Sequence, residues 1–373
     1  MHDHGNSASG DGQYNPFIVS DNRGGFYVAY MERKSGKTDV MFQQSTASGG
    51  FTAGVRVSTS GDGAVRNENP PKIAVSANGN VYVVWANEKE RWKGNIRFAR
   101  SINGGKTFER AIDLNSDALQ APVSRGFESI AVDGKGRIFV AWIDERNKTA
   151  SDRGAEIWMA VSEDDGRTFS HDRRTVSGVC ECCRTALAVD SAGRVFLSYR
   201  SVPSSGLMYR DIAIARSDDG GRTFKPALVS RDGWELNACP IAGASMTIDA
   251  ADKIHVVWFT TIKDVPRLFA VSSSDHGLTF SKPAVFAPNQ KLAKHAHVVA
   301  ASDGRILVAW DDVNRTSVVK WGFLDASGKP VSTSDTQSGA SYPIIAISGN
   351  RIGLVALQSN DAGIIRKIQT LHR

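Results

Sequence analysis

The stretch Ile138-Phe139-Val140-Ala141-Trp142 decides the fold, because closely similar stretches recur along the whole chain. The other copies are FYVAY at 26–30, VYVVW at 81–85, VFLSY at 195–199, IHVVW at 254–258, ILVAW at 306–310 and a weaker IGLVAL at 352–357. Each copy is rich in β-branched and aromatic residues and follows a turn rich in Gly, Asn, Asp or Ser, which is typical of a strand. No segment has a sustained helical period. The sequence therefore predicts an all-β protein built from repeats.

The repeat unit has the length and content of one propeller blade. Successive copies end 47 to 59 residues apart, and the second unit contains four strand-like segments: PKIAVS at 71–76, VYVVW, NIRFARS at 95–101 and AIDLN at 111–115. Two β-sandwiches are the alternative, but sandwich strands need no fixed period. We predict a β-propeller of seven blades, or six as the alternative, each with four antiparallel strands. The last unit contains only three such segments, so we expect residues 10–16 to complete it.

A second motif, Ser-x-Asp-x-Gly-x-Thr-Phe, follows the third strand of several units. Full copies begin at Ser162, Ser217 and Ser273, a near copy beginning at Ser101 has Asn103 in place of Asp, and a degraded copy spans 45–51. In such a turn the Asp or Asn accepts backbone N–H bonds, the Gly takes a positive φ, and the Phe packs under the blade. These turns resemble the Asp-box (BNR) repeats of the sialidase-like superfamily over residues 15–373.

The resemblance implies a propeller fold and raises glycoside hydrolysis as an activity. Sialidases of this kind bind the substrate carboxylate with three arginines, the first of which lies in an Arg-Ile-Pro motif. The matching stretch here, Asn15-Pro16-Phe17-Ile18, has no arginine, and those enzymes have six blades. A sialidase-like glycoside hydrolase is therefore an alternative function, and fold alone does not assign it.

All four cysteines fall near one position of the repeat. Cys180 precedes Tyr199 by 19 residues and Cys239 precedes Trp258 by 19, so the two are equivalent on adjacent blades. The other two cysteines follow within three residues of Cys180. The next unit carries two histidines in the same approach, and the first is equivalent to Arg184. Because inner strands surround one axis, their starts should converge at one channel mouth.

Thiolates and imidazoles at one mouth are the donors of a soft-metal site. We predict a copper site, with zinc as the second choice, whose ligands are Cys180, Cys182, Cys183, Cys239, His295 and His297. Arg125, Glu128 and Arg184 are expected to line the same mouth and to orient a small anionic ligand or glycan. The first hypothesis for function is therefore metal handling or copper-dependent redox chemistry.

Disulfides are the competing interpretation of the cysteines. An even number of cysteines in an exported protein ordinarily forms disulfides. A Cys180–Cys239 bond between blades, with Cys182 and Cys183 joined to each other, is the natural pairing from the repeat. On this interpretation the chain is a non-catalytic binding scaffold with disulfide-linked blades.

Composition limits the partners and the location. The net charge of +6 comes from 45 Lys and Arg against 39 Asp and Glu, and the basic residues are scattered, which argues against nucleic acid as a partner. No window approaches the roughly 18 apolar residues of a membrane span. We expect a flexible tail at 1–14 and one propeller domain at 15–373. The tail lacks the apolar core of a signal peptide, so we expect a periplasmic or secreted protein whose signal has been removed.

Overall fold

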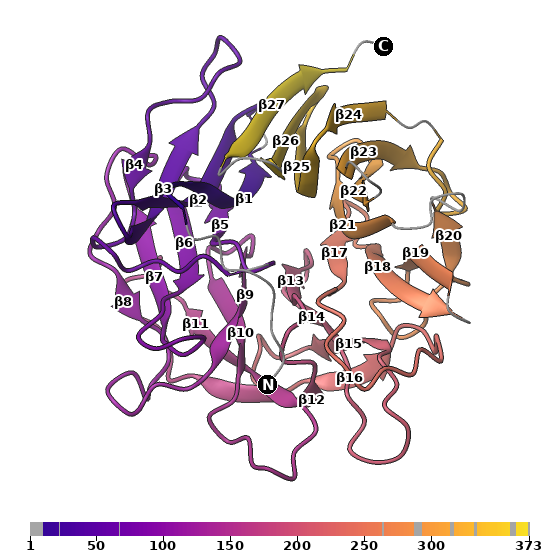
Figure 1. The fold of residues 1–373 in the computed structure, drawn as a ribbon. Coiled ribbons are helices and arrows are strands. Elements are labelled where there is room, and N and C mark those ends of the chain that lie inside the picture. Colours follow the sequence, from indigo (N-terminus) through magenta and orange to yellow (C-terminus); the bar gives the residue numbers. More distant parts are fainter. Residues whose placement is uncertain are drawn as a thin grey trace.

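The fold is a ring of seven small antiparallel sheets around one axis (Figure 1). The computed structural model describes residues 10–21, 23–66, 68–262, 265–286, 293–313, 317–331, 334–358 and 363–371. Within these ranges there are 27 strands and no helix, and so no helix that could cross a membrane. Six sheets have four strands and the seventh has three. The prediction of a seven-bladed propeller is confirmed, and the six-bladed alternative is wrong.

The first four blades follow the chain from the axis outward. Blade one contains β1 (Gly12–Ser20), β2 (Phe26–Lys34), β3 (Lys37–Gln44) and β4 (Val55–Arg56). Blade two contains β5 (Lys72–Val75), β6 (Val81–Ala86), β7 (Ile96–Ser101) and β8 (Ile112–Asp113). Blade three contains β9 (Arg125–Val132), β10 (Ile138–Asp144), β11 (Ala155–Ser162) and β12 (Arg173–Val179). Blade four contains β13 (Ala186–Val189), β14 (Val195–Arg200), β15 (Ile212–Ser217) and β16 (Lys225–Leu228).

The last three blades continue in the same direction. Blade five contains β17 (Ser245–Ile248), β18 (Ile254–Ile262), β19 (Val265–Ser273) and β20 (Ala284–Phe286). Blade six contains β21 (Ala293–Ala300), β22 (Ile306–Val313), β23 (Ser317–Leu324) and β24 (Ser334–Ser338). Blade seven contains β25 (Ala340–Ser348), β26 (Arg351–Gln358) and β27 (Ile364–Thr370). The first strand of each blade lies nearest the axis in Figure 1.

The ring closes differently from our expectation. The prediction that residues 10–16 complete the last blade is wrong, because β1 pairs with β2 as the inner strand of blade one. Residues 12–14, which we placed in the tail, belong to this strand. Closure comes from packing: β1 contacts β25 and β26, and Ile18 shares a core cluster with Ile344 and Val355. Apolar burial between the first and last blades thus replaces a shared sheet.

The recurrent aromatic residues form the core between neighbouring blades. Trp85, Trp142, Trp258 and Trp310 are fully buried in the second strands of their blades. Trp142, for example, belongs to a cluster that includes Phe98 of the preceding blade. The residue that ends each recurrent stretch, which we call the landmark residue of its blade, therefore also packs adjacent blades together.

The Asp-box turns have the geometry predicted for them. In the blade-three copy the Asp164 carboxylate accepts the backbone N–H of Thr168 at 2.9 Å, and Gly166 has a φ of 77°. Phe169 packs edge-on against Phe98 with ring centroids 4.8 Å apart. These turns lie between the third and fourth strands, on the outer side of the blades, so they stabilise the fold and leave the channel mouth to other residues.

Candidate functional site

A bulge recurs where four of the innermost strands begin. The ladder register shifts there in β1, β9, β21 and β25. A non-glycine residue with φ between 47° and 54° sits at each bulge: Asn15, Phe127, His295 and Tyr342. All four precede the landmark residue of their blade by 15 positions. Positive φ is uncommon for such residues, and a bulge changes the direction in which a side chain points.

The four cysteines come together at the lead-in to blades four and five. Cys180 Sγ lies 2.7 Å from Cys183 Sγ and 3.6 Å from Cys182 Sγ. Cys182 is disulfide-bonded to Cys239, with the two Cα atoms 6.3 Å apart. The expected Cys180–Cys239 and Cys182–Cys183 pairing is therefore wrong. Residues 180–183 form a turn in which the N–H of Cys183 faces the carbonyl of Cys180, so these two side chains converge and Cys182 faces blade five.

The cluster has a buried part and an accessible part. We call Cys180 and Cys183 the inner pair, since they are 0% and 1% exposed. We call Cys182 and Cys239 the outer pair: Cys182 is 4% exposed and lines a cavity, and Cys239 is half-buried. The apolar side chain of Val202 packs against the buried sulfurs. The inner pair is therefore shielded from water, whereas the outer pair borders a cavity through Cys182 and is half-buried at Cys239.

Two buried arginines adjoin this cluster without a carboxylate partner. Arg200 is fully buried and donates to three backbone carbonyls, those of Arg210, Ala242 and Phe259. Arg210 donates to the backbone carbonyls of Leu236 and Ala238. No described carboxylate forms a salt bridge with either guanidinium. A buried cation without a counter-charge is costly, so negative sulfur atoms nearby would offset this cost.

The arginines and the short sulfur contact favour one thiolate in the inner pair. Burial opposes ionisation of Cys183, but the S–H of Cys180 and the positive charge of Arg200 outweigh it and lower the pKa of Cys183. Burial and the same sulfur contact raise the pKa of Cys180 well above its ordinary value. The pair thus resembles a thiol donating to a thiolate. Thiolates are the form in which cysteine binds metals and attacks disulfides.

His295, a predicted ligand, lies in a different environment from the cysteines. Its Nδ1 is 2.7 Å from Asp311 Oδ2 and its Nε2 is 3.1 Å from Glu68 Oε1, while Tyr342 stacks on the ring with centroids 3.9 Å apart. Burial alone would lower the pKa of His295, but the two carboxylates raise it to about 9. Both ring nitrogens are therefore engaged, and the ring is a cation at neutral pH.

His297, the other predicted histidine ligand, faces the channel instead. Its ring meets Phe17 edge-on at 5.9 Å, and its Nδ1 lies 3.4 Å from the N–H of Ile345. Burial, followed by the charges of Arg184 and Lys72, lowers the pKa of His297 to about 3. His297 is thus neutral. The described contacts join neither histidine to the sulfur cluster.

An ionic network crosses the axis and connects blades that are not neighbours. Glu68, in the lead-in to blade two, lies between His295 of blade six and Arg184 of blade four, whose Nε is 3.4 Å from Glu68 Oε2. With Asp311 the network alternates negative and positive groups, and all four residues are at most 8% exposed. These contacts join blades two, four and six at the axis.

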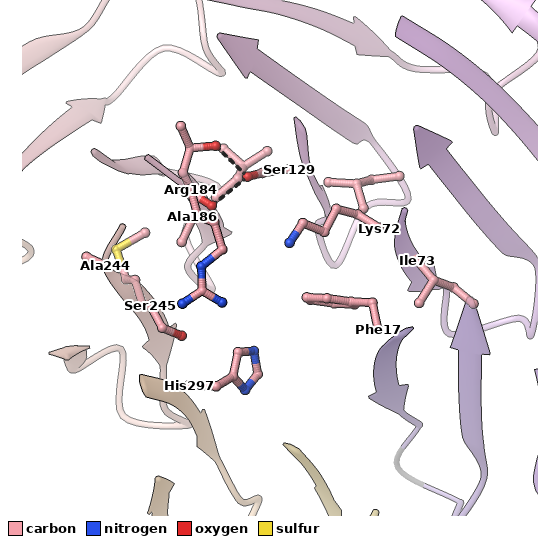
Figure 2. A pocket seen from close by; sticks show the side chains of 13 residues that line it. Phe17, Lys72, Ile73, Ser129, Arg184, Ala186, Ala244, Ser245 and His297 are labelled. Carbon is pink, nitrogen blue, oxygen red and sulfur yellow. Dashed lines mark hydrogen bonds between the residues drawn. The ribbon is translucent and has the colours of Figure 1, made fainter. Parts of the chain in front are cut away.

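A cavity of about 110 Å³ lies on the axis next to this network. Figure 2 shows Lys72, Arg184 and His297 pointing into it from three blades. Burial, followed by the charge of Arg184, lowers the pKa of Lys72 to about 7. Lys72 Nζ lies 4.3 Å from the ring centroid of Phe17 and no described carboxylate forms a salt bridge with it. The cavity is therefore rich in nitrogen donors.

Arg125 and Glu128 do not share this cavity with Arg184. Arg125 is held by Asp144 at 2.7 Å and by Asp117, and it lines a second cavity of about 330 Å³ next to Cys182. Glu128 is fully buried and accepts the N–H of Ala86, and burial raises its pKa to about 7. The prediction that the three residues line one space is wrong, because the bulge at Phe127 turns the residues before it away from those after it.

Sequence reasoning missed five residues of the site: Glu68, Lys72, Arg200, Arg210 and Asp311. Two of them carried a usable signal. Arg200 and Asp311 each directly follow the landmark residue of their blade, and a charged residue inside an apolar strand marks a buried polar interaction. The other three lie where the repeat gives no reason to expect a function.

Fold and site together define a seven-bladed Asp-box propeller whose channel mouth holds a buried sulfur cluster beside an ionic network. The sequence model of the BNR repeat-like domain matches residues 24–372, and the chain belongs to this family. No curated protein sequence matches the chain.

Solved structures resemble the chain at the level of the fold. An ulvan lyase of polysaccharide lyase family PL25, determined with GlcA(1-4)Rha3S bound, has a TM-score of 0.62 at 13% identity, covering 97% of this chain and 94% of its own. The Hadza microbial sialidase Hz136 has a TM-score of 0.57 at 14% identity, and the match covers 89% of this chain and 73% of the sialidase chain. The NanB sialidase of Streptococcus pneumoniae has a TM-score of 0.53 at 12% identity, and the match covers 94% of this chain and 90% of the NanB chain. Identities this low carry no activity across to this chain.

Proposed function

We propose that the chain is a metal-handling propeller in which Cys180, Cys182, Cys183 and Cys239 bind a soft metal ion as thiolates. One observation carries the proposal: four sulfurs from two adjacent blades form a single cluster. Three of them, those of Cys180, Cys182 and Cys239, lie within 4.8 Å of one another, as metal ligands do. Reduction of the Cys182–Cys239 bond makes all four available.

Monovalent copper is the first choice of metal, and zinc is the second. Both ions accept sulfur donors. Copper in its monovalent form needs no imidazole, which suits a cluster to which neither His295 nor His297 belongs. A metal with several thiolates carries net negative charge, and Arg200 and Arg210 provide buried positive charge without a carboxylate partner.

The test is metal uptake by the reduced protein under anaerobic conditions. Wild-type protein should hold at least one equivalent of Cu(I) against a chromogenic chelator, and Cys180→Ser or Cys183→Ser should lower retention at least tenfold. His297→Gln is the matched control and should retain the metal as the wild type does, because the His297 ring packs against Phe17 and not against the cysteines. Absence of stoichiometric uptake, or full uptake by Cys180→Ser, would refute the proposal. Zinc uptake without copper uptake would identify zinc as the bound metal.

A second candidate function, action on an acidic saccharide, is favoured by the channel cavity. Lys72 and Arg184 point into it and offer donors for a carboxylate or sulfate (Figure 2). Bidentate arginine contacts are well suited to such groups. A panel of fluorogenic sialosides and uronic-acid oligosaccharides tests this function: turnover that is lost in Arg184→Ala would support it. Absence of turnover with every substrate of the panel would refute this second function.

Export to the periplasm or the medium is part of the proposal. A Cys182–Cys239 disulfide is stable in oxidising compartments and rare in reducing ones. Fractionation of cells that express the native gene, with thiol alkylation before lysis, checks the location. Recovery in the cytosol with four alkylated cysteines would contradict it.

A further inference from the structure

We propose a further activity for the cysteine cluster, a two-stage thiol–disulfide relay. In this relay the outer pair exchanges with small thiols, and the inner pair exchanges electrons only with the outer pair. The relay uses the same four sulfurs as the proposed metal site, but it requires no metal. Its basis is the difference in access between the pairs, together with the distance that separates them.

Access differs because the two pairs lie at different depths. Cys182 lines the cavity of about 330 Å³, and Cys239 is half-buried. Cys180 and Cys183 are 0% and 1% exposed and are covered by apolar groups such as Val202. A dissolved thiol can therefore reach the outer pair and is excluded from the inner pair, since exchange rates depend on access to the attacked sulfur.

The two pairs are close enough to react with each other. Cys180 Sγ is 3.6 Å from Cys182 Sγ and 2.7 Å from Cys183 Sγ. Cys180 can thus act as the bridge, because it is in contact with one sulfur of each pair. The other sulfur of the outer pair, that of Cys239, comes from the next blade and serves as a leaving group at the surface.

The internal exchange is balanced without any other reactant. The Cys180 thiol passes its proton to the Cys183 thiolate, and the Cys180 sulfur attacks Cys182 Sγ, which forms the Cys180–Cys182 bond and breaks the Cys182–Cys239 bond. Cys239 leaves as a thiolate and takes up that proton from Cys183. The Cys183 thiolate then attacks Cys180 Sγ, which forms the Cys180–Cys183 bond and releases Cys182 as a thiolate. Two electrons and one proton have moved from the inner pair to the outer pair.

Exchange with the surroundings takes place at the outer pair. Two molecules of a small thiol reduce the Cys182–Cys239 bond and leave as one disulfide, and the reverse reaction restores it. The cavity beside Cys182 is lined by the basic residues Arg91 and Lys93 and by the acidic residues Glu145 and Glu181. A thiol that carries both carboxylate and ammonium groups, with glutathione as the probe, fits this lining. The outer pair is thus the port through which the inner pair is oxidised or reduced.

Trypsin separates the redox forms, which makes the relay measurable. Cleavage after Arg174 and Arg184 releases peptide 175–184 with Cys180, Cys182 and Cys183, and Cys239 lies on peptide 232–253. An outer disulfide links the two peptides. An inner disulfide lies within the first peptide and leaves Cys239 free for alkylation.

The experiment uses the full chain with a chelator present, in the absence of oxygen. Glutathione mixtures adjust the protein to one disulfide per chain, acid quenches the exchange, and alkylation follows. Wild-type protein should give both the linked peptides and, in at least a tenth of the chains, alkylated Cys239 with an internal disulfide. Cys183→Ser should stop at a Cys180–Cys182 bond, again with Cys239 alkylated.

Cys180→Ser is the variant that separates the relay from simple disulfide reduction. It retains the outer disulfide but lacks the bridge, so Cys239 should stay linked in more than nine-tenths of the one-disulfide chains. Only linked peptides in the wild type, or equal Cys239 alkylation in Cys180→Ser, would overturn the relay. Near-UV circular dichroism checks that each variant is folded. Copper uptake is measured on fully reduced protein, so failure of one proposal is distinguishable from failure of the other.

Discussion

The lead-in to blade four and the lead-in to blade six occupy the same position of the repeat but carry different chemistry. On blade four the turn at residues 180–183 gathers sulfur atoms and receives Cys239 from blade five. On blade six the bulge at His295 places an imidazole between the carboxylates of Glu68 and Asp311. The difference teaches that the propeller supplies equivalent positions, and that local turns and bulges decide what each position does.

The two lead-ins should also respond to different conditions. The sulfur side is held by a covalent bond between blades, which reductants break and moderate changes of pH do not. The ionic side is held by charges, which pH and neutralising substitutions change and reductants do not. The following predictions test this contrast, in order of the expected effect.

The largest effect is expected on the sulfur side. Cys239→Ser removes a disulfide that closes a loop of 57 residues, and the chain-entropy estimate for such a loop is about 4 kcal/mol of the free energy of unfolding. Urea unfolding of the oxidised, metal-free protein measures it. Reductant should lower the stability of the wild type by a similar amount and leave the variant unchanged. A large effect of reductant on the stability of the variant would contradict this prediction, because the variant has no Cys182–Cys239 bond to reduce.

A somewhat smaller loss is expected when the ionic side is neutralised. Asp311→Asn keeps the size of a fully buried side chain but removes one of the two charges that face His295. Breaking a buried ion pair in this way costs about 3 kcal/mol. Asp303→Asn is the matched control on the same blade, because its pair with Arg305 is 52% exposed on the aspartate side, and exposed pairs contribute about 0 to 1 kcal/mol. Equal losses in the two variants would contradict the assignment.

The pH dependence should give the smallest of the three effects. His295 has a folded-state pKa of about 9 against its ordinary value of 6.5, so the folded state binds the proton more tightly. Its contribution is complete below pH 6.5 and is lost as the pH rises through 9, and on the order of 2 kcal/mol of this loss falls between pH 7 and pH 9. Unfolding curves at pH 6, 7.5 and 9 measure the loss. His295→Gln should flatten this part of the profile, and an unchanged slope in that variant would assign the dependence to another group.

Part of the site could be predicted from the repeat alone. The equal spacing of Cys180 and Cys239 from their landmark residues placed both at one end of adjacent blades, and the structure brings them into one cluster. The spacing could not tell which sulfurs pair, because the pairing depends on the turn at 180–183. Nor could it separate His295 from the cysteines, since the bulge there points the ring towards Glu68.

The sequence by itself determined the propeller, its four-stranded repeat unit and its Asp-box turns. These features repeat within each blade, and residues close in the chain form them through strand periodicity and turn chemistry. Only the tertiary structure decided the closure of the ring, the Cys182–Cys239 bond and the network that joins Glu68 to His295. Those contacts connect different blades, and they depend on where each side chain points around the axis. A periodic pattern fixes which residues reach the axis, but it does not fix which partners they meet there.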